Sequence, residues 1–140
     1  MRTYLLDTSA IHTLCFATPP EKWRQAWDGM RSGIAGLVLL EPIVSEMASR
    51  LTQLHGKARV ERVVRFLKGL GRTDIYSPDD SAALEAGYLH GTHGRSISLV
   101  DATIIVAAMR TNAVLVTHDE AMRNIAAGQG VRVNWLPHTE

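Results

Sequence analysis

Short apolar runs alternate with helical patterns along the whole chain, and this alternation restricts the possible folds more than any other feature. Residues 36–40 and 113–117 are almost entirely apolar and bounded by turn residues, which is typical of strands buried on both faces. Residues 3–7, 74–76 and 131–135 predict three further strands. Strands that alternate with helices form a parallel sheet covered by helices on both faces. We therefore predict an α/β fold.

Helical patterns occupy the intervals between these strands. Prolines, glycines and capping residues set their approximate limits at residues 9–15, 21–31, 42–54, 57–70, 79–90, 98–110 and 119–127. The glycines of residues 91–95 predict a loop between the helices of residues 79–90 and 98–110. No internal repeat or linker is visible, so residues 1–140 are predicted to form a single domain with a central, mostly parallel sheet of about five short strands.

Composition excludes several classes of protein. The 140 residues are 46% hydrophobic and 21% charged, which is usual for a globular domain. The apolar run of residues 34–40 is far shorter than the roughly 20 residues that a membrane span needs. We also expect no secretory signal, because Asp7 interrupts the first apolar stretch. A single cysteine, Cys15, cannot form an intramolecular disulfide, which favours a reducing, cytoplasmic setting.

The net charge of +1 hides an asymmetry between the two halves of the chain. Residues 1–72 contain 11 Lys and Arg against 6 Asp and Glu, whereas residues 73–140 contain 4 against 8. Much of the excess falls on one predicted helix at i,i+3 spacing, at Arg59, Arg62, Arg65 and Lys68. Two interpretations stay open: a stripe that follows an RNA backbone, or an ordinary solvated helix face.

Four carboxylates occupy corresponding places in the predicted fold. Asp7 ends the first strand, Glu46 lies early in the helix after the second strand, and Asp119 follows the fourth strand. Asp101 lies in the first turn of the helix that Ser98 begins. The carboxyl ends of parallel strands share one edge of the sheet, and ligands bind there. We therefore expect these four acids to gather at that edge.

Gathered carboxylates repel one another unless a cation lies between them. Their hard oxygen atoms suit Mg²⁺ or Mn²⁺, and such an ion can hold a phosphodiester and activate water for attack. Each acid also has a structural interpretation. Ser98 and Asp101 have the spacing of a capping box, Asp119 and Asp7 can cap the helices after them, and Glu46 can be a solvated helix residue.

The motifs around these acids give the chain a family resemblance, spread in order over nearly its whole length. It resembles a PIN-domain ribonuclease, and more narrowly the VapC-like toxins of toxin–antitoxin pairs. The motifs that carry the resemblance are Leu5-Leu6-Asp7-Thr8-Ser9-Ala10, Pro42-Ile43-Val44-Ser45-Glu46, Ser98-Leu99-Val100-Asp101-Ala102 and Leu115-Val116-Thr117-His118-Asp119. After Asp119 the sequence departs from the family, which often has an aromatic residue where Glu120, Ala121 and Met122 stand.

The resemblance implies a fold, an activity and partners. The fold is a PIN-like three-layer α/β/α arrangement, and the activity is endonucleolytic cleavage of RNA. The pocket that binds Mg²⁺ or Mn²⁺ would be formed by Asp7, Glu46, Asp101 and Asp119. Hydroxyl groups of Thr8 and Ser98 would support this pocket, with Thr117 beside them. Family members are usually homodimers, and the tail of a cognate antitoxin usually occupies the pocket.

Several alternatives compete with a toxin nuclease. A housekeeping RNA-processing nuclease of the same fold, or a PIN-like module that binds RNA or a partner without cutting, would have a similar sequence. A phosphoacceptor domain needs a lysine after its last strand, and the three lysines, Lys22, Lys57 and Lys68, follow no predicted strand. A haloacid-dehalogenase-like phosphatase needs a second aspartate where Ser9 stands.

Histidine and tryptophan residues have simpler interpretations. His118, beside Asp119, is expected to be a solvent-facing loop side chain, although contact with substrate or help with proton transfer is an alternative. His90 and His93 are expected to flank a loop rather than to form a zinc pair. Trp23 and Trp27, at i,i+4 spacing, predict core packing or a weak candidate for a dimer interface.

Overall fold

The computed structural model describes residues 1–138, and within them the chain forms seven helices and five strands. The five strands are β1 (Thr3–Leu6), β2 (Gly36–Leu39), β3 (Thr73–Ile75), β4 (Val114–Thr117) and β5 (Val133–Trp135). The seven helices are α1 (Thr8–Phe16), α2 (Glu21–Ser32), α3 (Glu41–His55), α4 (Lys57–Lys68), α5 (Asp80–His93), α6 (Leu99–Thr111) and α7 (Glu120–Gly128). Among these helices none is long and apolar enough to cross a membrane.

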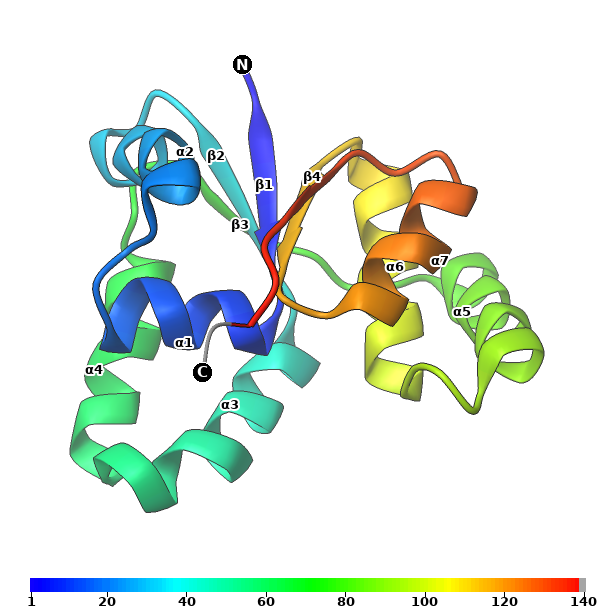
Figure 1. Ribbon diagram of the computed structural model, residues 1–140, viewed down its shortest axis with the longest axis horizontal. Helices are drawn as coiled ribbons and strands as arrows, with labels where there is room; N and C mark the ends of the chain where they lie inside the picture. The colour runs from blue at the N-terminus through cyan, green and yellow to red at the C-terminus, as the bar shows by residue number, and fades with distance from the viewer. Residues whose placement is uncertain (139–140) are drawn as a thin grey trace.

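All neighbouring strands pair in parallel, in the order β3-β2-β1-β4-β5. Figure 1 shows α1 to α4 on one side of this sheet and α5 to α7 on the other. The predicted three-layer α/β/α fold is confirmed, and the sheet is parallel throughout. The order of strands reverses at β1, because β2 and β3 extend to one side of it and β4 and β5 to the other. The carboxyl ends of β1 and β4 therefore form a topological switch point, where ligands bind in open α/β sheets.

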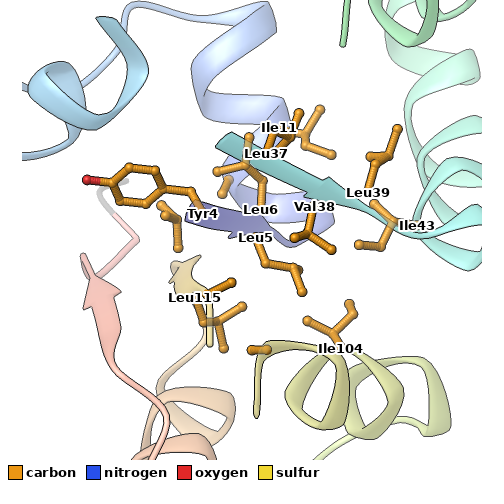
Figure 2. Packing of buried hydrophobic residues seen from close by; sticks show 14 of the residues in the cluster. Tyr4, Leu5, Leu6, Ile11, Leu37, Val38, Leu39, Ile43, Ile104 and Leu115 are labelled. Atoms are coloured by element: carbon orange, nitrogen blue, oxygen red, sulfur yellow. The ribbon is translucent and has the colours of Figure 1, made fainter. Parts of the chain in front are cut away.

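The core surrounds the central strand β1. Leu5 is fully buried and lies in register with Val38 of β2 and Leu115 of β4. In Figure 2, Leu5 points toward Ile104 of α6, whereas Leu6 points toward the opposite helical layer, where Ile11 lies. Both faces of β1 are thus covered, which explains why this strand is a continuous apolar run rather than an alternating one.

Helix α5 continues to His93, into the first three residues of the segment 91–95 that was expected to be a loop, whereas Gly94 and Arg95 form a turn as expected. The loop prediction was wrong for residues 91–93, because an isolated glycine costs a helix only about 1 kcal/mol, which tertiary packing can offset. Ala82 and Ala86 of α5 pack against Val106 of α6 and supply such packing.

Both tryptophans of α2 belong to the core. Trp23 is 0% exposed and Trp27 is 5% exposed, because this face of α2 packs against the rest of the molecule. The prediction of core packing is confirmed. Trp23 has no exposed surface to offer a dimer interface, whereas Trp27 lines an open pocket beside Arg31 and Phe66, so the suggested interface stays a prediction for Trp27.

Truncation of the central core side chain tests this arrangement. We expect Leu5→Ala to lower the free energy of unfolding by about 2–5 kcal/mol, because it leaves a cavity between β1 and its neighbours. The control Leu84→Ala removes a side chain that is 56% exposed on α5, and it should change that free energy by less than about 1 kcal/mol. Urea denaturation of both variants measures the difference, and equal losses would contradict the assigned core.

Candidate active site

The four predicted carboxylates line one open pocket at the switch point. The pocket has a volume of about 440 Å³, and Asp7, Glu46, Asp101 and Asp119 all contribute to its wall. Asp7 directly follows β1 and Asp119 directly follows β4, while α3 and α6 supply the other two. Asp7 and Asp119, which lie more than 100 positions apart in the sequence, therefore border the same pocket as the other two acids.

Asp7 is the most buried of the four, with 5% of its surface exposed. Its Oδ1 accepts hydrogen bonds from Ser9 Oγ at 2.6 Å and from the backbone N–H of Ala10 at 2.9 Å. Its Oδ2 accepts one from Thr117 Oγ1 at 2.5 Å. Burial raises the pKa of Asp7 from 3.8 to about 6, although these hydrogen bonds act in the opposite direction and nearby Asp101 adds to the rise. The hydrogen bonds therefore do not fully offset the cost of burying the ionised Asp7 carboxylate.

Asp101 and Asp119 each cap a helix with one carboxylate oxygen. Asp101 Oδ2 accepts from the backbone N–H of Ser98 at 3.1 Å and completes a capping box, while Asp119 Oδ1 accepts from the backbone N–H of Met122 at 2.9 Å. The other oxygen of each carboxylate accepts no hydrogen bond from residues 1–138. Helix capping and a role in the pocket are therefore compatible, because they use different oxygen atoms.

Electrostatic repulsion also acts within the pocket. The pKa of Asp101 is raised, first by burial and further by the negative charges of Glu46 and Asp119, while hydrogen bonds from Ser98 oppose the rise. Glu46 is fixed from another element, since Thr8 Oγ1 donates to its Oε1 at 2.5 Å. A cation in this pocket would relieve the repulsion.

The three hydroxyl groups predicted beside the pocket differ in what they contact. Thr8 donates to Glu46, and Thr117 donates to Asp7 while it accepts from the backbone N–H of Asp119 at 2.9 Å. Ser98 Oγ instead accepts from the backbone N–H of Asp101 at 3.0 Å. Two of the hydroxyls thus orient carboxylates directly, and the third fixes the helix that carries one.

The donor set suits a hard divalent cation held in an open site. Among residues 1–138, no three His, Cys, Asp or Glu side chains are grouped closely enough to form a ready-made metal cage. Mg²⁺ does not need such a cage, because it retains several waters and binds through one or two carboxylates together with substrate phosphate. The free oxygens of Asp101 and Asp119 and the buried carboxylate of Asp7 fit that requirement.

His118 is not the solvent-facing side chain that its position suggested. It is 9% exposed, and its ring lies between Thr13 Oγ1, at 2.7 Å from Nε2, and the backbone carbonyl of Leu136, at 2.9 Å from Nδ1. The prediction was wrong because the segment after β5 folds back over the β4–α7 turn, a packing that no local pattern in the sequence indicates.

Six further residues line the pocket that the sequence did not single out as site residues. Arg50 follows Glu46 by one helical turn, so helical spacing offered a signal for it. Ser9 and Glu120 lie within two positions of a predicted acid, which is also a local signal. The other three carry no such signal. The six are Ser9, Arg50, Glu120, Trp135, Pro137 and His138.

The predicted basic stripe lies on α4 and is not part of the pocket wall. Lys68 approaches Glu41 of α3 at 3.3 Å, and the Arg59 guanidinium lies 4.9 Å from the ring centre of Phe16. Arg62 and Arg65 are exposed on the same helix. Arg50 is the basic side chain that borders the acids, with Nη2 3.9 Å from Glu46 Oε2.

Comparison with known proteins gives a family and a set of similar folds. The model of the PIN domain family matches residues 4–128. Among solved structures, the DNA-bound VapBC of Salmonella typhimurium is 19% identical, with a TM-score of 0.69 over 96% of this chain and 98% of that chain. VapBC2 of Rickettsia felis, bound to a promoter DNA fragment, is 17% identical, with a TM-score of 0.68 over 95% and 98% of the two chains.

A third structure, VapBC-1 of nontypeable Haemophilus influenzae, is 19% identical, with a TM-score of 0.67 over 96% of this chain and 97% of that chain. No curated protein matches the sequence. At these identities the structural likeness establishes the fold, and the acids must be judged by their own geometry.

The buried charge of Asp7 predicts a gain in stability when it is neutralised. Since its folded pKa is raised to about 6, the folded protein holds the proton more tightly than the unfolded chain, and stability is lost as the pH rises from about 4 to 6. In EDTA at pH 7.5 we expect Asp7→Asn to raise the free energy of unfolding by about 1–3 kcal/mol. The gain should shrink toward zero near pH 4.

Urea denaturation at the two pH values measures this effect. Asp28→Asn, which alters an exposed carboxylate on α2, is the matched control and should show no such pH-dependent gain. If the wild type were as stable as Asp7→Asn at pH 7.5, the ionised Asp7 carboxylate would not destabilise the metal-free protein, and the expectation would be wrong.

Proposed function

Because the chain belongs to the PIN domain family, we propose that it is a metal-dependent endoribonuclease and the toxin of a VapBC-type toxin–antitoxin pair. The observation that carries the proposal is the pocket at the switch point, which four carboxylates from four separate segments line. Their geometry supports phosphodiester cleavage more than it supports a purely structural role. None of the four acids uses both of its carboxylate oxygens to cap a helix, so each has an oxygen that helix capping does not occupy.

Asp7, Glu46, Asp101 and Asp119 would hold Mg²⁺ or Mn²⁺. When bound, the ion supplies an activated water for attack on phosphorus and neutralises charge on the phosphate oxygens. The protein contributes a fixed set of acceptors. Hydrogen bonds from Ser9, Ala10 and Thr117 orient Asp7, and the helix starts orient Asp101 and Asp119. Preorganisation of this kind keeps the reacting groups aligned without further rearrangement.

The RNA backbone would meet positive charge at the mouth of this pocket. Arg50 lines the pocket and is 66% exposed, so it is free to contact a phosphate. The stripe of Arg59, Arg62, Arg65 and Lys68 would extend this positive surface along α4, away from the acids. Long-range attraction by such side chains strengthens binding without selecting sequence.

The proposed biological setting follows from the family and from the similar structures. Those structures are VapBC complexes, in which a toxin is found with its antitoxin, and we propose a cognate antitoxin for this chain as well. A homodimer is proposed on the same family grounds. A cytoplasmic location fits both the RNA substrate and the single, half-buried Cys15.

A cleavage assay tests the central proposal. Purified protein is incubated with total cellular RNA in Mn²⁺ or Mg²⁺, beside EDTA and the variants Asp7→Asn and Asp101→Asn. We expect discrete fragments from the wild type and a loss of at least about a hundredfold in rate for both variants. Asp28→Asn serves as the matched control and should retain the wild-type rate.

Three results would reject the assignment. Unchanged cleavage by a folded Asp7→Asn or Asp101→Asn protein would remove these acids from the reaction. RNA binding without cleavage in Mn²⁺, in a preparation free of antitoxin, would indicate a non-cleaving PIN-like module. Fragments that map to a maturation site of a stable RNA would instead favour a housekeeping nuclease.

Salt dependence separates the two basic regions. Binding of a fluorescein-labelled single-stranded RNA to the Asp7→Asn protein is measured by anisotropy at several KCl concentrations. We expect Arg50→Ala to weaken binding and to lower the slope of log K against log salt by about 0.7, the value for one lost phosphate contact. Arg62→Ala reports on the stripe, and Arg132→Ala, which alters an exposed arginine just before β5 and outside the pocket wall, is the control. An Arg50→Ala slope equal to that of Arg132→Ala would exclude a phosphate contact at Arg50.

A further inference from the structure

A second cavity adjoins the acidic pocket and differs from it in chemistry. It has a volume of about 440 Å³, and its wall shares His118, Pro137 and His138 with the acidic pocket. The rest of its wall includes Thr13 and Leu136. Among the described residues that line it there is no Asp, Glu, Lys or Arg. A ligand that crosses from one cavity to the other would therefore pass from a strongly acidic region to a largely apolar one.

A column of three aromatic rings ends at the junction of the two cavities. The ring centres of Trp23 and His118 are 4.5 Å apart with a tilt of 47° between their planes, and those of His118 and His138 are also 4.5 Å apart but stacked, with 25° between their planes. Trp23 is 0% exposed and His118 is 9% exposed, whereas His138 is exposed. The column thus begins in the core and terminates in a ring with free surface.

The middle ring of this column is rigidly held. His118 Nδ1 donates to the carbonyl of Leu136, which leaves Nε2 to accept the hydrogen bond from Thr13 Oγ1. Trp135 Nε1, at the end of β5, also donates to the backbone carbonyl of His118 at 3.1 Å, so residues 135 and 136 both hold this turn. His138 therefore stacks on a fixed ring, and an ordered stacking partner reduces the conformational entropy that is lost when a ligand binds.

We propose that this second cavity binds the nucleobase next to the phosphate held in the acidic pocket, with the base stacked against His138. The inference rests on the proposed function, since it takes RNA as the substrate. A phosphate needs the cation of the acidic pocket, whereas a base offers a flat, uncharged ring that suits imidazole stacking. In a nucleotide the base and the phosphate are covalently joined, and the two cavities are neighbours, since His118, Pro137 and His138 line both of them.

The cavity offers a means of distinguishing bases as well as holding them. Stacking on a ring is tolerant of sequence, because every base has a π face. The hydroxyl of Thr18, which also lines the cavity, can donate to or accept from the edge of a base. The site would therefore favour a nucleotide context rather than impose a strict sequence.

Nucleotide binding tests the proposal without any cleavage. The C2 proton signals of the six histidines are followed by NMR in Mg²⁺ while each of the four nucleoside 5′-monophosphates, or ribose 5-phosphate, is added to the full chain. We expect at least one nucleotide to shift the signals of His118 and His138 clearly more than ribose 5-phosphate does, since both rings also border the acidic pocket where a phosphate would bind. Equal effects of both kinds of ligand, or no effect of any nucleotide, would overturn the proposal.

Variants at the exposed ring give the second measurement. We expect His138→Ala to weaken binding of that nucleotide by at least about fivefold, and His138→Phe to restore it, because a ring is all that stacking requires. His93→Ala, which alters a histidine at the end of α5, is the matched control. Wild-type affinity in His138→Ala would also overturn the proposal.

The two proposals can fail independently. If the RNA is never cut but the nucleotide still shifts His138 and depends on it, the nuclease assignment fails and the base site stands. If RNA is cut in a metal-dependent way while nucleotides and ribose 5-phosphate behave alike, the nuclease stands and the base site is rejected.

Discussion

The burial of one carboxylate at the end of the central strand is the constraint on which the candidate site depends. Asp7 lies where β1 enters α1, in a position that the sheet and two helical layers enclose. Ser9, Ala10 and Thr117 all donate to it, so the β1–α1 turn and the end of β4 are organised around this group. The fold thereby places the Asp7 carboxylate where water solvates it poorly. The free energy that this desolvation costs is typical of functional sites.

The same turn links the site to a third segment. Thr8, the next residue, donates to Glu46 of α3, and α3 begins after β2. The acids are consequently positioned by short polar contacts between elements, while apolar residues such as Leu5 fix those elements relative to one another. Core and site are separate in composition but share β1, whose apolar residues end where Asp7 begins.

How much the sequence predicted depends on whether a signal was local. The strands near Leu5 and Leu115 and the capping box of Ser98 were predictable, because hydrophobic runs and capping residues act within a few positions of the chain. The gathering of four acids in one pocket followed from the parallel topology. The extent of α5 past Gly91 was not predictable, because packing on α6 overrides the propensity of one glycine. The burial of His118 was missed for a similar reason, because its hydrogen-bond partners, Thr13 and Leu136, are distant from it in the sequence.

The end of β5 is connected to Asp7 by a series of hydrogen bonds. The peptide carbonyl of His118 accepts from Trp135, and its peptide N–H donates to Ser9 Oγ at 3.2 Å, which in turn donates to Asp7. One residue of the β4–α7 turn therefore connects the last strand of the sheet to the carboxylate at the end of the central strand. Residues from both ends of the described chain therefore fix the orientation of one carboxylate: Ser9 near the start contacts Asp7 directly, and Trp135 near the end holds the turn that contacts Ser9.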